Sequence, residues 1–199
     1  MSTSASPGGD DVTSRPRGTT PDLYTRSDIS RAVRRLASEI VERNRGAENV
    51  VLLGIRRRGD ILAERIAREI HGLEEIDVPV GYLDITLYRD DVGTRMEQPV
   101  LHKTEIMFPI DDRIVVLADD VLFTGRTIRA ALSAILDLGR ASKIQLAVLC
   151  DRGGRELPVA PDYVGFEVAV RPHEQVKVLL HELDGEEGIK VLQEEEPGR

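Results

Sequence analysis

The chain has 199 residues, of which 41% are hydrophobic and 31% are charged. These proportions are typical of a soluble globular protein, and no apolar run approaches the ~20 residues that a membrane-spanning helix needs. The formal net charge of −8 excludes a protein whose whole surface binds nucleic acid, although it allows a local basic face. A single cysteine, Cys150, excludes an internal disulfide and a cysteine-based zinc cluster, so we expect a cytoplasmic protein.

The two ends of the chain differ in composition from its middle. Residues 1–24 are rich in Ser, Thr, Pro, Gly and Asp, which predicts a disordered tail, and they lack the basic and apolar regions of a signal peptide. Residues 25–190 are expected to form one domain. Residues 191–199 are expected to form an acidic C-terminal tail.

Helix and strand patterns alternate through the first half of the chain. A helix is predicted from Ser27, a plausible N-cap, to about Arg45, because apolar residues recur at helical spacing. The apolar run 50–55 predicts a buried strand, and a second helix and a second strand are expected over 60–71 and 78–87. The polar segment that follows, to about residue 110, has no periodicity, which is typical of a functional loop.

The second half continues the alternation. Residues 115–118 are apolar and predict a strand covered on both faces, followed by a helix with Leu136 among its buried residues. A further strand is predicted over 144–149, and the remainder, with apolar runs at 164–169 and 176–180, is expected to form a smaller lobe. Alternating strands and helices predict a parallel sheet that binds its ligands at the C-terminal strand ends.

Two acids and an anion-binding loop follow the strand 115–118. Asp119 and Asp120 come directly after it, and Thr124, Gly125 and Thr127 stand before the next helix. Backbone N–H groups at a helix N-terminus favour an anion, so this loop predicts a phosphate site. The acids would repel that phosphate and suit ribose hydroxyls or a hydrated cation instead. Together they predict a phosphorylated-sugar site, with a magnesium site of another α/β protein or a solvated loop as the alternatives.

A basic loop follows the first strand. Three consecutive arginines stand between Gly54-Ile55 and Gly59. Alone, this pattern is typical of a solvated turn. At a strand end beside a sugar-phosphate site, it predicts a pyrophosphate clamp, because glycines allow the backbone to approach an anion closely.

These patterns resemble a known family. Residues 115–127 resemble the phosphoribosyl-pyrophosphate (PRPP) motif of the type I phosphoribosyltransferases, and 84–91 and 144–158 resemble the members that are both uracil phosphoribosyltransferases and pyrimidine operon regulators. The resemblance implies an α/β fold, a mainly parallel twisted sheet flanked by helices, with a small hood lobe and a flexible lid loop. It also implies a pentosyl transfer in which uracil and PRPP give UMP and pyrophosphate, with Mg2+ as the cofactor.

The resemblance also implies site residues. Asp119, Asp120 and Arg58 are expected to be catalytic, with magnesium carried by PRPP and the two acids as its candidate protein ligands. Base contacts are expected from Arg152 and from backbone groups near Val176 and Val178, and the loop 56–58 is expected to have an unusual peptide geometry. The residues expected to bind PRPP or nucleotide are Arg57, Arg58, Arg89, Asp119, Asp120, Val121, Leu122, Phe123, Thr124, Gly125, Arg126 and Thr127.

The first predicted helix carries a cluster of arginines that could contact RNA, namely Arg31, Arg34, Arg35 and Arg43. The resembling regulators bind the leader of pyrimidine-operon messenger RNA, tightened by uridine nucleotides such as UMP and UTP, and arginines can neutralise RNA phosphates. A solvated helix face paired with glutamates is the alternative. The chain also departs from the pattern, because Arg34, Ser38 and Gly154 stand where Thr, His and His are expected.

We therefore expect an active transferase that also regulates and forms at least a homodimer. An RNA-binding sensor of uridine nucleotides with little turnover, and a transferase for another base such as a purine, are the alternative hypotheses.

Overall fold

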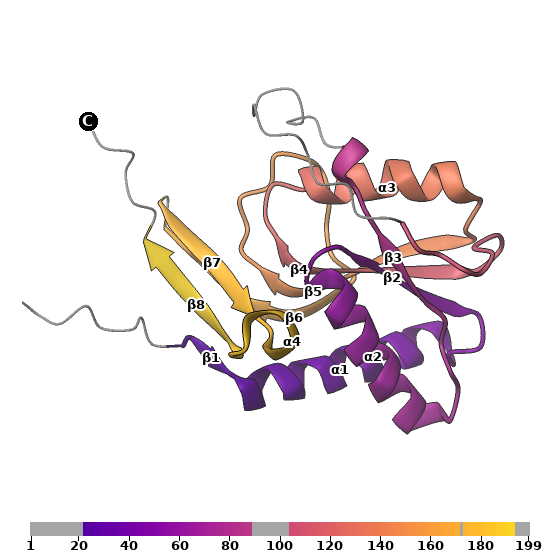
Figure 1. Cartoon of the computed structure of the whole chain (residues 1–199), viewed down its shortest axis with the longest axis horizontal. Helices are drawn as coiled ribbons and strands as arrows, with labels where there is room; N and C mark the ends of the chain where they lie inside the picture. Colours follow the sequence, from indigo (N-terminus) through magenta and orange to yellow (C-terminus); the bar gives the residue numbers. More distant parts are fainter. Residues whose placement is uncertain (1–21, 89–103, 172, 194–199) are drawn as a thin grey trace, which may run out of the picture.

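The computed structural model describes residues 22–88, 104–171 and 173–193. Its elements alternate between strands and helices until the last third of the chain, where strands dominate (Figure 1). In chain order they are β1 (Tyr24–Thr25), α1 (Arg26–Asn44), β2 (Val50–Ile55), α2 (Gly59–Glu74), β3 (Val80–Leu83), the 3-10 helix η1 (Thr86–Tyr88), β4 (Ile114–Leu122), α3 (Arg126–Leu138), β5 (Lys143–Asp151), β6 (Tyr163–Glu167), β7 (Glu174–Leu179), α4 (His181–Asp184) and β8 (Gly188–Gln193).

The main sheet is parallel, with five strands in the order β3-β2-β4-β5-β6, as the sequence predicted. Helices α1 and α2 cover one face and α3 covers the other (Figure 1). Strand β4 lies at the centre and is fully buried from Val115 to Ala118, which explains its continuous apolar run. Its C-terminal end therefore opens at the middle of the sheet edge, where ligands of such sheets bind.

The N-cap of α1 lies two residues before the predicted one, Ser27. Thr25 is the cap, and a capping box joins its backbone N–H to Asp28 Oδ2 at 2.9 Å. These hydrogen bonds from Thr25 lower the pKa of Asp28. The helix ends at Arg45, whose left-handed backbone (φ 60°) directs its N–H back to the carbonyl of Glu42.

A second, antiparallel sheet forms a hood beside the main sheet, with the order β1-β8-β7 (Figure 1). Residues 164–169 were predicted to belong to this lobe. That prediction is wrong, because β6 pairs parallel with β5 and completes the main sheet. Tyr163 explains the difference, since its side chain is 2% exposed and packs in the main core. The hood also includes Tyr24 and extends to Gln193, beyond the domain limits expected from the sequence.

The predicted burial of α3 is only partly correct. Ile128, Ala131 and Ile135 are buried, but Leu136 is 69% exposed, and Ala130 and Ala134 take its place against the sheet. Among the residues that the structure describes, no helix combines the length and apolar character of a membrane span.

Candidate active site at the end of β4

The twin acids lie within β4 rather than after it. The strand continues four residues past Ala118, and Asp119 pairs with Val148 of β5. Asp119 is only 5% exposed, and its Oδ1 accepts the backbone N–H of Asp120 at 3.0 Å. Asp120 Oδ1 accepts the N–H of Val121 at 3.0 Å in the same way. Each carboxylate therefore uses its Oδ1 to accept a backbone N–H of the same strand.

The environment of the two acids opposes their ionisation. Burial raises the pKa of Asp119 well above its usual range, and repulsion from Asp120 adds to this. Burial also raises the pKa of Asp120, while the nearby positive charge of Arg58 acts in the opposite direction. A ligand that offers hydroxyl donors or a cation would compensate for this cost, which is the behaviour expected of a binding site.

The loop after β4 presents an anion site at the start of α3. Gly125 is the N-cap, with φ 90°, a conformation that favours glycine. A Cβ there would lie 3.3 Å from Leu157 Cβ, so the loop packs closely on its neighbours. Thr124 Oγ1 accepts the N–H of Arg126 at 3.3 Å, and Thr127 follows in the first turn of this helix, whose N–H groups favour an anion. Val121 is half-buried and Leu122 is buried, so within this segment they contribute mainly backbone groups.

Arg155, to which no role was predicted from the sequence, also holds this loop. Its guanidinium donates to Phe123 O at 2.9 Å and to Asp151 Oδ2 at 2.6 Å, and its Nε donates to Val159 O at 3.1 Å. In addition, Thr124 O accepts two backbone N–H groups from residues 156 and 157. These bonds hold the carbonyls of Phe123 and Thr124 and so fix the shape of the loop.

The basic loop lies directly against the acids. Gly59 packs on Ala118, so that a Cβ at Gly59 would collide with the Ala118 carbonyl oxygen and lie 3.2 Å from Asp119 Cα. A Cβ at Gly54 would lie 2.5 Å from Gly59 O, so both glycines are required for this approach. The peptide bond between Arg56 and Arg57 is cis, an unusual geometry like the one that the resemblance implied.

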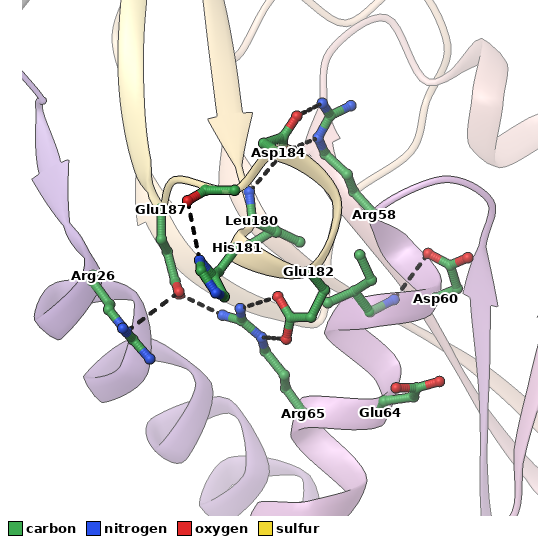
Figure 2. A network of polar contacts seen from close by, with 12 residues as sticks. Arg26, Arg58, Asp60, Glu64, Arg65, Leu180, His181, Glu182, Asp184 and Glu187 are labelled. Atoms are coloured by element: carbon green, nitrogen blue, oxygen red, sulfur yellow. Dashed lines mark hydrogen bonds and ion pairs between the residues drawn. The ribbon is translucent and has the colours of Figure 1, made fainter.

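The three loop arginines take different directions. Arg57 is exposed. Arg56 stacks over the Tyr82 ring at 5.1 Å and lies 3.5 Å from Glu105. Arg58 turns to the hood, where its Nη2 donates to Asp184 Oδ1 at 2.8 Å (Figure 2). No short-range sequence pattern indicates this last contact, because its partners lie 126 residues apart.

Arg152 lies at the strand ends together with the acids of β4 and the basic loop. Its guanidinium carbon lies 3.7 Å from the centre of the Phe123 ring, and it lines a cavity of about 310 Å³ together with Asp151, Gly153, Glu167, Val168 and Ala169. Within the described residues, its buried Nε has no hydrogen-bond partner. Gly154 also packs against this aromatic ring, because a Cβ there would lie 2.6 Å from Phe123 Cε2.

The side chains of Val176 and Val178 are 6% and 2% exposed and pack in the core between the hood and the main sheet. The base contact expected from these two positions is one of backbone groups, and it remains a prediction. Arg89 and residues 90–103 of the expected lid lie outside the described residues.

The candidate RNA-binding arginines occupy a different surface, along α1. Each has a partner in the structure: Arg31 pairs with Asp28, Arg34 with Glu69, Arg35 with Glu39, and Arg43 with Asp162. Arg35 also donates to the Gly165 carbonyl of β6. Their side chains remain 48–70% exposed, so this basic face is solvated but not unpaired.

The fold and this site define the class of protein. A model of the phosphoribosyl transferase domain family matches residues 21–180. Among solved structures, a hypoxanthine phosphoribosyltransferase from Staphylococcus aureus is 19% identical with a TM-score of 0.67 and covers 87% of this chain and 91% of its own. The enzyme of Trypanosoma cruzi is 19% identical with a TM-score of 0.66, over 87% of this chain and 97% of its own. These likenesses confirm the predicted fold.

Closer relatives narrow the class. A "Bifunctional protein PyrR" from Pelotomaculum thermopropionicum is 56% identical over 171 residues, which are 86% of this chain and 94% of that protein. Another of that name from Deinococcus deserti is 52% identical over 169 residues, or 85% and 92%. The chain therefore belongs to the PyrR family of phosphoribosyl transferases.

Proposed function

We propose that the chain transfers the ribose phosphate of PRPP to uracil, giving UMP and pyrophosphate. The observation that carries this proposal is the succession of Asp119, Asp120 and the anion loop 123–127 along one strand–loop–helix unit. Acids that suit ribose hydroxyls stand next to N–H groups that suit a 5′-phosphate. The packing of Gly59 on Ala118 adds the basic loop to the same place.

The residues present can support this reaction by positioning and charge. We propose that the acids hold the ribose hydroxyls while the loop holds the 5′-phosphate, so that the sugar is fixed at both ends. Fixing two reactants in this way can supply about 7–11 kcal/mol of a barrier. Bond breaking would leave positive charge on the sugar and negative charge on pyrophosphate. We propose that Arg57 and Arg58 stabilise the negative charge.

Magnesium fits the donor set as a partner of the substrate. The described residues contain no cluster of three or more His, Cys, Asp or Glu side chains that could hold a metal ion alone. Mg2+ commonly binds through one or two carboxylates plus substrate phosphates and water, and Asp119 and Asp120 meet that requirement. When bound, the ion would neutralise charge on the pyrophosphate.

The cavity beside Arg152 is our candidate base site. It lies at the ends of β5 and β6, one strand beyond the acids in the sheet order. The buried Nε of Arg152 suits a carbonyl acceptor, and uracil presents carbonyl oxygens on its ring. Backbone groups of the hood strand β7 complete this proposal for base contact.

We propose RNA binding as a second function of the cytoplasmic protein. The name "Bifunctional protein PyrR" of the relatives supports it, and so does the exposed arginine row of α1. Pyrimidine-operon messenger RNA would be the ligand, with UMP or UTP as the signal and a homodimer or larger assembly as the binding form. A salt-dependent affinity that increases with UMP is the expected behaviour.

One experiment tests both parts. Purified protein is incubated with PRPP, Mg2+ and each free base, and nucleotide formation is measured by chromatography. We expect UMP with uracil and no nucleotide with hypoxanthine or guanine. RNA binding is then measured with and without UMP. Purine nucleotide in place of UMP would contradict the base assignment, and absence of any nucleotide would leave only the RNA-binding sensor.

A further inference from the structure

An ion pair joins the hood to the basic loop. Arg58 donates from Nη2 to Asp184 Oδ1 at 2.8 Å and from Nε to Asp184 Oδ2 at 3.4 Å (Figure 2). Both side chains are largely shielded, with 26% and 16% exposure. A pair that is partly removed from water and contacts two nitrogens along one edge of the guanidinium fixes its direction as well as its charge.

Asp184 is itself held in place. Its Oδ2 accepts the backbone N–H of Leu180 at 2.8 Å, and its own N–H donates to the Leu180 carbonyl at 2.8 Å. Burial alone would raise the pKa of Asp184, but the hydrogen bonds from Arg58 and Leu180 outweigh it and the pKa is lowered. The carboxylate is therefore a fixed negative charge at neutral pH rather than a mobile side chain.

The hood segment around Asp184 is anchored on α2. Arg65 donates to Glu182 from Nε at 3.0 Å and from Nη2 at 2.5 Å, and from Nη1 to Glu187 at 2.5 Å (Figure 2). Helix α2 has Arg58 as its N-cap. One helix thus fixes both the backbone that carries Arg58 and the hood that carries its partner.

The remaining edge of Arg58 is available to a ligand. Nε and Nη2 are used by Asp184, and among the described residues Nη1 has no hydrogen-bond partner. The planar guanidinium offers its donors in a rigid fork, so fixing one edge also fixes where the other edge points. Arg58 is also near enough to Asp120 for its positive charge to favour ionisation of that carboxyl.

We propose that Asp184 is a positioning residue that holds Arg58 side-on, so that the free edge of its guanidinium meets the pyrophosphate group of the substrate. This inference rests on the proposed transferase function. The carboxylate does not contact the reacting atoms. It acts by removing the rotational freedom that an arginine side chain would otherwise lose when the anion binds.

The test compares Asp184→Asn with Glu186→Gln, which changes a nearby exposed carboxylate that pairs with Lys190 and lies outside the contacts of Arg58 and Arg65. Calorimetry measures binding of magnesium pyrophosphate, and steady-state kinetics measure the KM values of PRPP and uracil separately. For Asp184→Asn we expect the Kd for pyrophosphate and the KM for PRPP to rise about 3- to 10-fold, the scale of immobilising one long side chain. The KM of uracil should stay within about twofold, as should every constant of Glu186→Gln.

A double-mutant cycle separates positioning from a general effect on the hood. In an Arg58→Gln background, Asp184→Asn should have no further effect on pyrophosphate affinity, because it acts through that guanidinium. An additional loss in that background, or unchanged or tighter pyrophosphate binding by Asp184→Asn alone, would overturn the inference. Wild-type protein that binds no pyrophosphate and forms no nucleotide would instead show that the proposed function itself is wrong, and the inference would fall with it.

Discussion

Replacing Asp119 by Asn should stabilise the protein and inactivate it at the same time. The side chain is 5% exposed, and its charge is buried beside Asp120. Asparagine keeps the Oδ1 acceptor of the 3.0 Å hydrogen bond from the Asp120 N–H, so the strand geometry should survive. The substitution therefore removes the negative charge and leaves the shape almost unchanged.

The size and pH dependence of the stabilisation follow from the burial. Because burial raises the pKa of Asp119, the carboxyl contributes stability that is present at low pH and is lost as the pH rises through the folded-state pKa. Removing such a functional charge typically gains about 0.5–2 kcal/mol. In a domain of this length each kcal/mol shifts the Tm by about 2–4 °C, so we expect a rise of roughly 1–8 °C. The gain should be larger at about pH 8 than at about pH 5.

Thermal unfolding of wild type and Asp119→Asn at both pH values measures this effect, and uracil transfer measures activity. We expect activity to fall by at least about 100-fold, the loss typical of removing a group that contacts the transition state. Asp77→Asn is the control, because its side chain is 95% exposed and its Tm should not change. A lower Tm at both pH values, or activity close to wild type, would refute the reasoning.

Three further changes test the supports of the site. Gly54→Ala should destabilise the protein by about 1–3 kcal/mol in urea unfolding, because its Cβ would lie 2.6 Å from the backbone N of residue 60. Gly72→Ala is the control and should be neutral or stabilising, because a Cβ there would have nothing within 4 Å. Equal effects of the two changes would contradict the packing argument. Arg155→Met should lower the free energy of unfolding by about 2–4 kcal/mol, since the Asp151 carboxylate and Phe123 O lose the guanidinium that donates to them. It should also weaken UMP binding in calorimetry. Intact UMP affinity would leave Arg155 a purely structural role. Arg35→Glu should weaken RNA binding, reduce its salt dependence by about one unit of slope and spare catalysis; unchanged RNA affinity would place the RNA site elsewhere.

The main sheet could be predicted because each of its elements carries a local pattern. The apolar runs of β2 and β4 and the helical spacing of α1 depend only on neighbours in the sequence. The acids and the anion loop were also predictable, since they belong to one continuous segment. Strand β6 was misplaced because its position depends on pairing with β5 and on burial of Tyr163, which no local pattern expresses.

The parts that could not be predicted depend on side chains that meet across the fold. Arg58 meets Asp184 over 126 residues, and Arg65 meets Glu182 over 117. In the sequence, those acids belong to a run that is typical of a solvated acidic segment. Charge alone therefore could not distinguish surface carboxylates from those that pair with Arg58 and Arg65.

The pairs of Arg65 show why the hood needs charged contacts at all. Arg65 and Glu187 are 14% and 5% exposed, so their desolvation offsets much of their attraction and the pair adds little net stability. The pair contributes more to the orientation of the hood. A hydrophobic contact would let the short helix α4 slide, whereas the guanidinium can donate to Glu182 and Glu187 in only one arrangement. Since α2 starts at the basic loop, this arrangement sets the distance from hood to loop, and that distance places Asp184 at Arg58.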